Sequence, residues 1–445
     1  MENGKITFNE ALMQGLSSAG PVLNLVALFP IVLGIMGHWS FLALLLSTLV
    51  GAFTVFTGYS FSRVMSTNGG YYSYVGRTFG KGAGIFTAIL YLTYSFMAFP
   101  SIVLFLNYFV DTFVPQYLSG DLFFNVGFSS AISLYLILIV FRGLRITMRY
   151  ILVSGIIEVG FIFGLCVFMA LSGTPHNILK YSFSSNSLFS ALPFGLLAFA
   201  GIGSSIFLSE NTKDWKRNTH RSVLYAYLLL SALMLAPVFI ISVFFSSAGI
   251  TAFTVNPLSL FYGLPPSLGL FVELLFSVIA INSALNLSVA FLNAFRNSFT
   301  KVLEDGIIIA VKGTRTTLRI VALIIMAITI TLSVIANLTQ DLYYYFVVVT
   351  GIVSIMFLAV HTISNVALIR YLKSVGTYLS MPIPIISVLS FAFIIFESII
   401  LSNSVAHTSA VISILLIFIT FCIVVFVRAR TGKYYSDINF NVEME

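Results

Sequence analysis

The chain alternates long apolar segments with short polar connections along almost its whole length. Twelve segments are long enough to cross a bilayer, because about 20 apolar residues in a helix span its hydrocarbon core. They show no two-residue alternation, which favours helices over the strands of a membrane barrel. The sequence therefore predicts an all-α integral membrane protein with twelve transmembrane helices, at approximately 9–37, 40–62, 83–110, 122–141, 149–171, 188–210, 221–247, 264–296, 318–338, 342–370, 382–402 and 407–428.

The basic residues lie almost entirely on one side of these helices. Of the 22 Lys and Arg residues, only Lys180 falls outside the two termini and the connections that follow even-numbered helices. Cytoplasmic connections are enriched in Lys and Arg, so we expect both termini in the cytoplasm and the protein in the cell membrane. Orientation in a lipid bilayer thus explains the net charge of +7, and no nucleic-acid partner is expected.

The composition offers little for catalysis. Hydrophobic residues make up 59% of the chain and charged residues 8%, and the five histidines are scattered without metal-ligand spacing. The two cysteines, Cys166 and Cys422, lie in separate apolar segments, which gives no disulfide framework. A phosphate-binding GxxxxGK[ST] loop is absent from the sequence. We therefore expect neither an enzyme nor a bound cofactor, beyond a coupling proton or Na⁺.

Two predicted helices carry glycine and serine in their middles, GLSSAGP (15–21) in helix 1 and AFAGIGSS (198–205) in helix 6. Glycine costs a helix about 1 kcal/mol relative to alanine, and proline removes a donor. A half-helix N-terminus attracts a carboxylate, and freed carbonyls accept an ammonium group or a cation, which suits an amino acid. Close helix packing through small residues is the alternative. The predicted substrate contacts are Ser17, Ser18, Ala19, Gly20, Pro21, Phe199, Ala200, Gly201, Ile202 and Gly203.

The two weak points fall in the first and the sixth helix. That spacing is expected if five helices are repeated with inverted topology and each repeat begins with a discontinuous helix. The predicted division is a first repeat at 1–171, a second at 172–375, and two additional helices with a short cytoplasmic tail at 376–445.

Motifs spread over about 300 residues support this organisation. They are TNGGYYSYVGRTFGKGAG (67–84), GLRITMRY (143–150), FAGIGSSIFLSENTKDWKRNTHRSV (199–223), NAFRNSFTKVLEDG (293–306) and HTISNVALIRYL (361–372). In their order and spacing the chain resembles the amino acid, polyamine and organocation (APC) superfamily of permeases, which have the leucine-transporter fold. The resemblance implies a secondary active transporter that moves an amino acid or polyamine by alternating access.

The resemblance also implies roles for individual residues. Tyr91 matches a helix 3 position that faces the substrate in such permeases. Gly203 stands where many members have a glutamate, so only backbone contacts transfer from helix 6.

Glu158 is the main candidate for energy coupling. Helix 5 enters near residue 149, so at 1.5 Å per residue Glu158 lies about 14 Å deep, near the midplane. A charged carboxylate is costly there, so Glu158 could take up and release a proton, help to hold Na⁺, or simply bond a neighbouring helix. Proton-coupled members of the resembled superfamily have a lysine at the matching position. Ser288 lies near the same pocket in that comparison, and Glu210 is a candidate inner-gate residue pairing with Lys213 or Arg217.

The leading function is therefore a permease, with proton coupling expected. The alternatives are an amino acid or polyamine exchanger, a Na⁺-coupled carrier, and a nutrient sensor that binds without transport. The sequence identifies neither the particular amine nor the oligomeric state.

Overall fold

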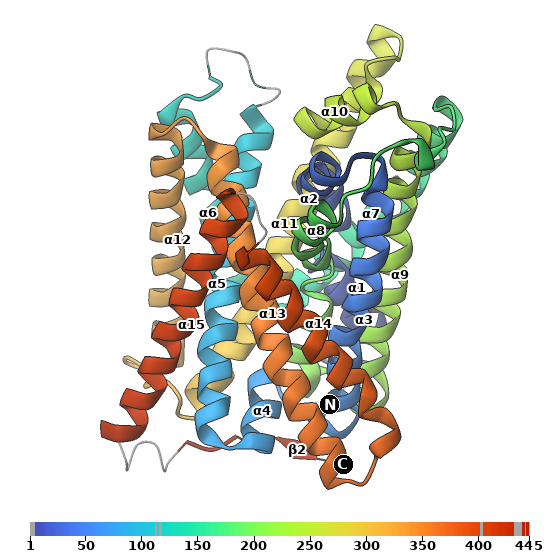
Figure 1. Cartoon of the computed structure of the whole chain (residues 1–445). Helices are drawn as coiled ribbons and strands as arrows, with labels where there is room; N and C mark the ends of the chain where they lie inside the picture. Colours follow the sequence, from blue (N-terminus) through green and yellow to red (C-terminus); the bar gives the residue numbers. More distant parts are fainter. Residues whose placement is uncertain are drawn as a thin grey trace.

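The computed structural model describes residues 5–111, 114, 118–400, 404–430, 438–440 and 442–444, which are almost entirely helical (Figure 1). The α-helices are α1 (Phe8–Ser17), α2 (Pro21–Met36), α3 (Ser40–Val64), α4 (Tyr71–Phe79), α5 (Lys81–Asp111), α6 (Leu122–Arg142), α7 (Leu144–Ser172), α8 (Ser185–Leu197), α9 (Trp215–Phe244), α10 (Ser247–Val255), α11 (Pro266–Glu304), α12 (Thr314–Leu338), α13 (Leu342–Ser374), α14 (Pro382–Ile400) and α15 (Ser404–Arg430). Short 3₁₀ helices are η1 (Gly37–Trp39), η2 (Ile178–Lys180), η3 (Ile202–Asn211), η4 (Pro257–Phe261) and η5 (Tyr378–Ser380), and the strands are β1 (Met65–Ser66) and β2 (Glu443–Met444).

Eleven helical runs of the described chain are long and apolar enough to cross a membrane, and the first is a run of 57 residues, Phe8–Val64. At 1.5 Å per residue that run would be about 85 Å long, far more than one crossing needs. Ile6, before its start, pairs with Thr212, and Thr67, after its end, bonds Ser209. Both ends thus lie beside the end of η3, so the run crosses and returns. Counted as two crossings, it gives the predicted twelve.

The two discontinuous helices lie against each other in opposite directions. α1 contacts η3, and α2 contacts α8 (Figure 1). Because α1 precedes α2 whereas α8 precedes η3, the two helices are antiparallel. This arrangement is what inverted repeats require; the boundaries 1–171, 172–375 and 376–445 stay a prediction.

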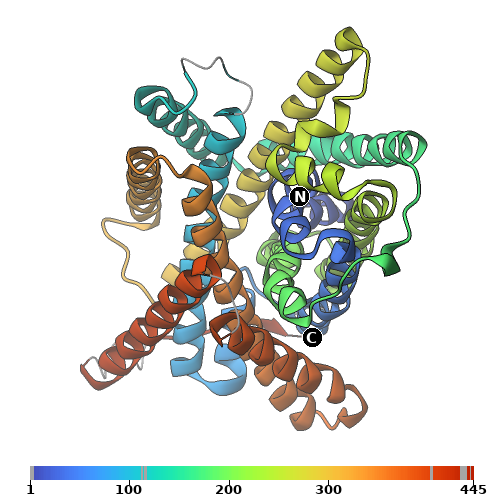
Figure 2. The same cartoon turned by 45° about the horizontal axis from the view of Figure 1, so that its top comes forward.

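The remaining helices surround this pair. α5 packs along α13 and α3 along α9, whereas α6, α12, α14 and α15 lie at the periphery (Figure 2). The peripheral helices expose large apolar side chains, such as Leu323, Leu389 and Phe418. A bilayer would cover these side chains, because water-exposed apolar surface of this extent is rare in soluble proteins.

The C-terminal segment docks on the end of the bundle where α3 meets α4. β2 pairs antiparallel with β1, and the Phe440 ring lies where glycine leaves room: a Cβ on Gly76 would lie 2.5 Å from it and one on Gly84 2.3 Å. The Tyr72 hydroxyl beside this ring donates to Asp305 at 3.1 Å. Burial, reinforced by the Asp305 charge, raises the pKa of Tyr72 well above its usual value, so the hydroxyl keeps its proton.

Candidate substrate site at the two helix breaks

Both predicted discontinuities are present. α1 ends at Ser17 and α2 begins at Pro21, while α8 ends at Leu197 and η3 begins at Ile202. A glycine with positive φ turns the chain in each gap, Gly20 at +59° and Gly201 at +93°, a conformation that other residues rarely adopt. The weak points in the sequence therefore do interrupt the helices.

The two breaks are in direct contact. A Cβ on Gly201 would lie 2.3 Å from the Ser18 carbonyl oxygen, so only glycine permits this approach. The Ser18 and Ser204 hydroxyls lie 2.6 Å apart. Asn24 bridges the breaks, because its side-chain amide donates to the carbonyls of Ala19 at 2.8 Å and Ala198 at 3.0 Å. This bridging role of Asn24 depends on the tertiary structure.

A cavity lies on each side of the touching breaks, and we name the two outer and inner after the orientation that the sequence predicts. The outer cavity, between α2, α5, α8, α11 and α13, is lined by Ser18, Ala19, Leu23, Asn24, Ala27, Leu28, Ala98, Ser101, Ile102, Phe105, Leu197, Ala200, Leu287, Phe291, Phe346, Thr350 and Val353. The inner cavity, toward α4 and η3, is lined by Thr54, Val55, Tyr71, Tyr91, Tyr94, Phe199, Gly201, Gly203, Ser204, Phe207, Val223, Phe291, Ala294, Phe357, Val360 and His361. Phe291 lines both cavities.

The predicted contacts divide between these cavities. Ser18, Ala19 and Ala200 line the outer one, whereas Tyr91, Phe199, Gly201 and Gly203 line the inner one. The other four predicted residues are buried beside the breaks and line neither cavity: Ser17, Gly20, Pro21 and Ile202.

Tyr91 faces the inner cavity because of its depth in α5. It lies ten residues from Lys81, about 15 Å along the helix. The outer cavity is reached only about two turns later, at Ala98. The Tyr91 ring stacks on Phe207 with centroids 4.5 Å apart, so these two rings form part of the inner wall.

Glu158, on α7, is fully buried at the start of α2. Ser283, on α11, donates to its Oε2 at 2.6 Å, and Asn286 donates to its Oε1 at 3.0 Å. The backbone N–H of Leu23, in the first turn of α2, donates to the Ser283 hydroxyl at 3.1 Å, and Asn286 also donates to Ser17 at 2.8 Å. The carboxylate is thus linked to both half-helices of the first crossing, and negative charge is favourable near a helix N-terminus.

Sequence reasoning missed Ser283 and chose Ser288 instead. Ser288 donates to the Ala284 carbonyl one turn back in its own helix. It is five residues beyond Ser283, which places it about 140° further around α11 at 100° per residue. The spacing of Ser283 and Asn286 could have indicated this residue, because Ser283 lies about one helical turn before Asn286 on the same face of the helix.

Glu210, at the end of η3, forms an ion pair with Lys301 of α11 at 3.0 Å. It also accepts the backbone N–H of Asn68 at 3.2 Å. The partner thus differs from the expected Lys213 or Arg217 and comes from a helix remote in sequence. The contact joins η3, α11 and the β1–α4 connection at one end of the molecule.

The helical crossings and the two breaks define an all-α membrane fold with two discontinuous helices packed against each other. No protein-family model and no curated protein matches this sequence. Two solved structures share the fold. One is a Na⁺-coupled sialic acid symporter in a substrate-bound outward-open state, with TM-score 0.55 and 12% identity over 88% of this chain and 89% of that one. The other is a manganese transporter of Eremococcus coleocola, with TM-score 0.55 and 14% identity over 96% of this chain and 95% of that one. Membership of the APC superfamily stays a prediction.

Proposed function

We propose that the chain is a secondary active transporter that moves an amino acid or a related amine across the cell membrane by alternating access, with both termini cytoplasmic. The fold supports transport, and the contact between the breaks carries the proposal. Main-chain groups at the breaks can bind the charged ends of a small solute. The cavities lie on either side of that contact and share Phe291, so rocking of α2 and η3 would expose the solute to one side of the membrane at a time.

Proton coupling through Glu158 is the favoured energy source. As a carboxylate, Glu158 on α7 accepts the hydroxyl of Ser283 on α11, and the same Ser283 oxygen accepts the N–H of Leu23 at the start of α2. Protonation would remove its charge from the N-terminal end of α2, where negative charge contributes about 0.3–2 kcal/mol. A proton would therefore loosen the half-helix that lines the outer cavity.

Sodium coupling is the second candidate. Asn286 is fully buried, and its Oδ1 atom has no hydrogen-bond partner among the described residues. Its amide contacts Glu158 and Ser17, so several oxygen atoms gather where a hard cation could bind.

Counterflow in proteoliposomes tests the transport proposal. Vesicles preloaded with an unlabelled amino acid should accumulate the labelled one transiently, since a carrier exchanges solute across the bilayer. Imposed proton and Na⁺ gradients then identify the coupling ion. Saturable binding without counterflow, for every amino acid and amine tested, would indicate a sensor and contradict the proposal.

A further inference from the structure

The side walls of the outer cavity are mainly apolar, whereas its end at the breaks carries polar backbone and amide groups. We infer, resting on the proposed transport function, that this cavity selects amino acids with an apolar side chain of medium size. The backbone of Ala19 and Ala200 and the amide of Asn24 lie at the break end. The α-ammonium and α-carboxylate of a zwitterion would lie there, and the side chain would point away into the cavity.

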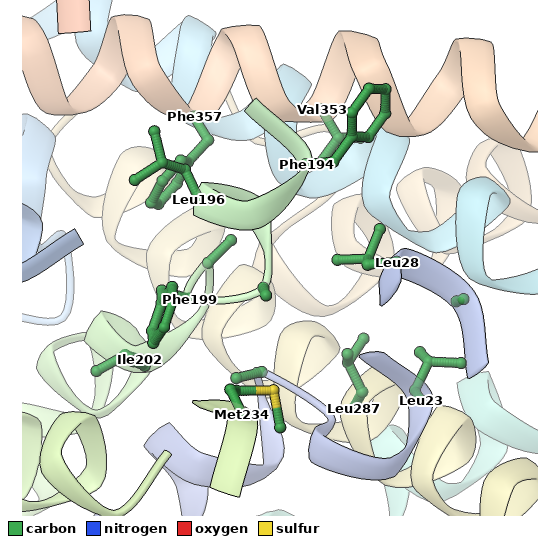
Figure 3. Packing of buried hydrophobic residues seen from close by; sticks show 14 of the residues in the cluster. Leu23, Leu28, Phe194, Leu196, Phe199, Ile202, Met234, Leu287, Val353 and Phe357 are labelled. Atoms are coloured by element: carbon green, nitrogen blue, oxygen red, sulfur yellow. The ribbon is translucent and has the colours of Figure 1, made fainter. Parts of the chain in front are cut away.

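Apolar side chains form most of the wall. Figure 3 shows part of it: Leu23 on α2 and Leu287 on α11 lie near the start of α2, and Leu28 lies further along α2. Ile102, on α5, and Val353, on α13, extend this surface. Burying apolar area on such a wall contributes about 25 cal/mol per Å², so it favours an aliphatic or aromatic substituent.

The polar side chains in the wall already make hydrogen bonds within the protein. Ser101 and Thr350 hydrogen-bond across the cavity wall at 2.6 Å. The Asn24 amide donates to two carbonyls, and Ser18 donates to the Gln14 carbonyl at 2.6 Å. These groups therefore offer little to a polar substrate side chain.

Among the described residues that line the outer and inner cavities, none is a carboxylate, Lys or Arg. A substrate with a charged side chain would lose its hydration there without gaining a partner, which is costly. Glu158, beside the start of α2, is outside the cavity lining and is bonded to Ser283 and Asn286. This argues against basic amino acids and polyamines within the wider class that the sequence allowed.

The wall of the cavity includes two aromatic rings, Phe105 and Phe346, and the small side chain of Ala98. The two rings pack with centroids 5.3 Å apart, and both line the cavity. Ala98 lies on α5 two turns before Phe105, where a larger side chain would occupy the space of the substrate. A methylene-sized change in such a pocket alters selectivity by about tenfold or more.

The test is competition against labelled leucine counterflow in proteoliposomes of the full chain. We expect leucine, isoleucine, valine, methionine and phenylalanine each to reduce the signal at least tenfold more effectively than lysine, glutamate or putrescine. Equal or better competition by lysine, glutamate or putrescine would overturn the inference while transport itself stood. If no labelled amino acid or amine undergoes counterflow at all, the proposed function fails, and the inference with it.

Two substitutions test the assignment of the wall. Ala98→Leu should weaken leucine competition at least tenfold relative to alanine, and Phe105→Leu should favour tryptophan over valine by a similar factor. Phe109→Leu is the matched control: Phe109 stacks on Phe105 at 5.6 Å from the same helix but does not line the cavity, so it should leave both ratios unchanged. If Ala98→Leu reduced leucine and alanine competition equally, or Phe109→Leu shifted the ratios as Phe105→Leu does, the assignment would be wrong.

Discussion

Glu158→Gln is the substitution that separates coupling from transport. It preserves the shape of the side chain while removing its charge and its exchangeable proton. The amide oxygen can still accept from Asn286, which donates to Glu158 at 3.0 Å. Its NH₂ group would face Ser283, whose hydroxyl now donates to the carboxylate at 2.6 Å but can also accept. The variant should therefore fold, with α2 held as it is when Glu158 is protonated.

The expected loss of solute accumulation follows from the number of protons that this position can bind, which is one. One proton carried per solute stores about 1.4 kcal/mol for each pH unit across the membrane. That energy supports about a tenfold accumulation of solute. In Glu158→Gln, accumulation under a gradient of one pH unit should fall from about ten to about one, because no group there can bind the proton. Counterflow between equal pH values should stay within about threefold of the parent.

The assay is uptake of labelled leucine by proteoliposomes with a pH step, read beside counterflow from the same preparation. Glu273→Gln is the matched control, because Glu273 is a half-buried carboxylate on α11 that lines neither cavity. It should retain pH-driven accumulation. Tenfold accumulation that persists in Glu158→Gln would refute proton coupling through this residue. Loss of counterflow as well would show that the carboxylate is needed for the transport cycle itself.

Three further outcomes follow from the contacts. Gly201→Ala should abolish counterflow and lower the melting temperature by several degrees, because the added Cβ would collide with the Ser18 carbonyl. Glu210→Lys should slow counterflow about tenfold by placing like charges together, and the double exchange with Lys301→Glu should restore it, since the pair is 3.0 Å apart; failure of the double exchange to recover the rate would remove Glu210 from the gate. Phe440→Ala should speed limited proteolysis of the C-terminal segment without changing cleavage elsewhere, because its ring fills the space left by two glycines.

The crossings could be predicted from the sequence because hydrocarbon thickness fixes helix length and composition together. The breaks were also predictable, since glycine and proline act locally on the helix that contains them. α4 and α10 were not predicted, because they are nine-residue helices in the connections. Each is too short to span a membrane, so the hydropathy pattern does not report them.

The site was predictable only where depth or local conformation decides it. The depth of Glu158 in the membrane follows from its distance along a helix. Its contacts with Ser283 and Asn286, in contrast, depend on how α7 and α11 are rotated about their axes. Lys301 lies 91 positions from Glu210, so proximity in sequence favoured the wrong cation. Tyr91 was assigned to the substrate by resemblance and Phe199 by its place at the helix 6 break, and the structure places both beside the inner cavity.

α2 connects the proposed coupling group with the proposed selectivity site. Leu23, Ala27 and Leu28 on this half-helix line the outer cavity, while the Leu23 N–H reaches Ser283 and through it Glu158. A ligand shifts a conformational equilibrium only by its difference in affinity for the two states. In the proposed mechanism, substrate in the cavity and a proton on Glu158 both act on the position of α2, so each would change the affinity for the other by the same factor. The first two turns of α2 are then sufficient to couple substrate binding to proton binding.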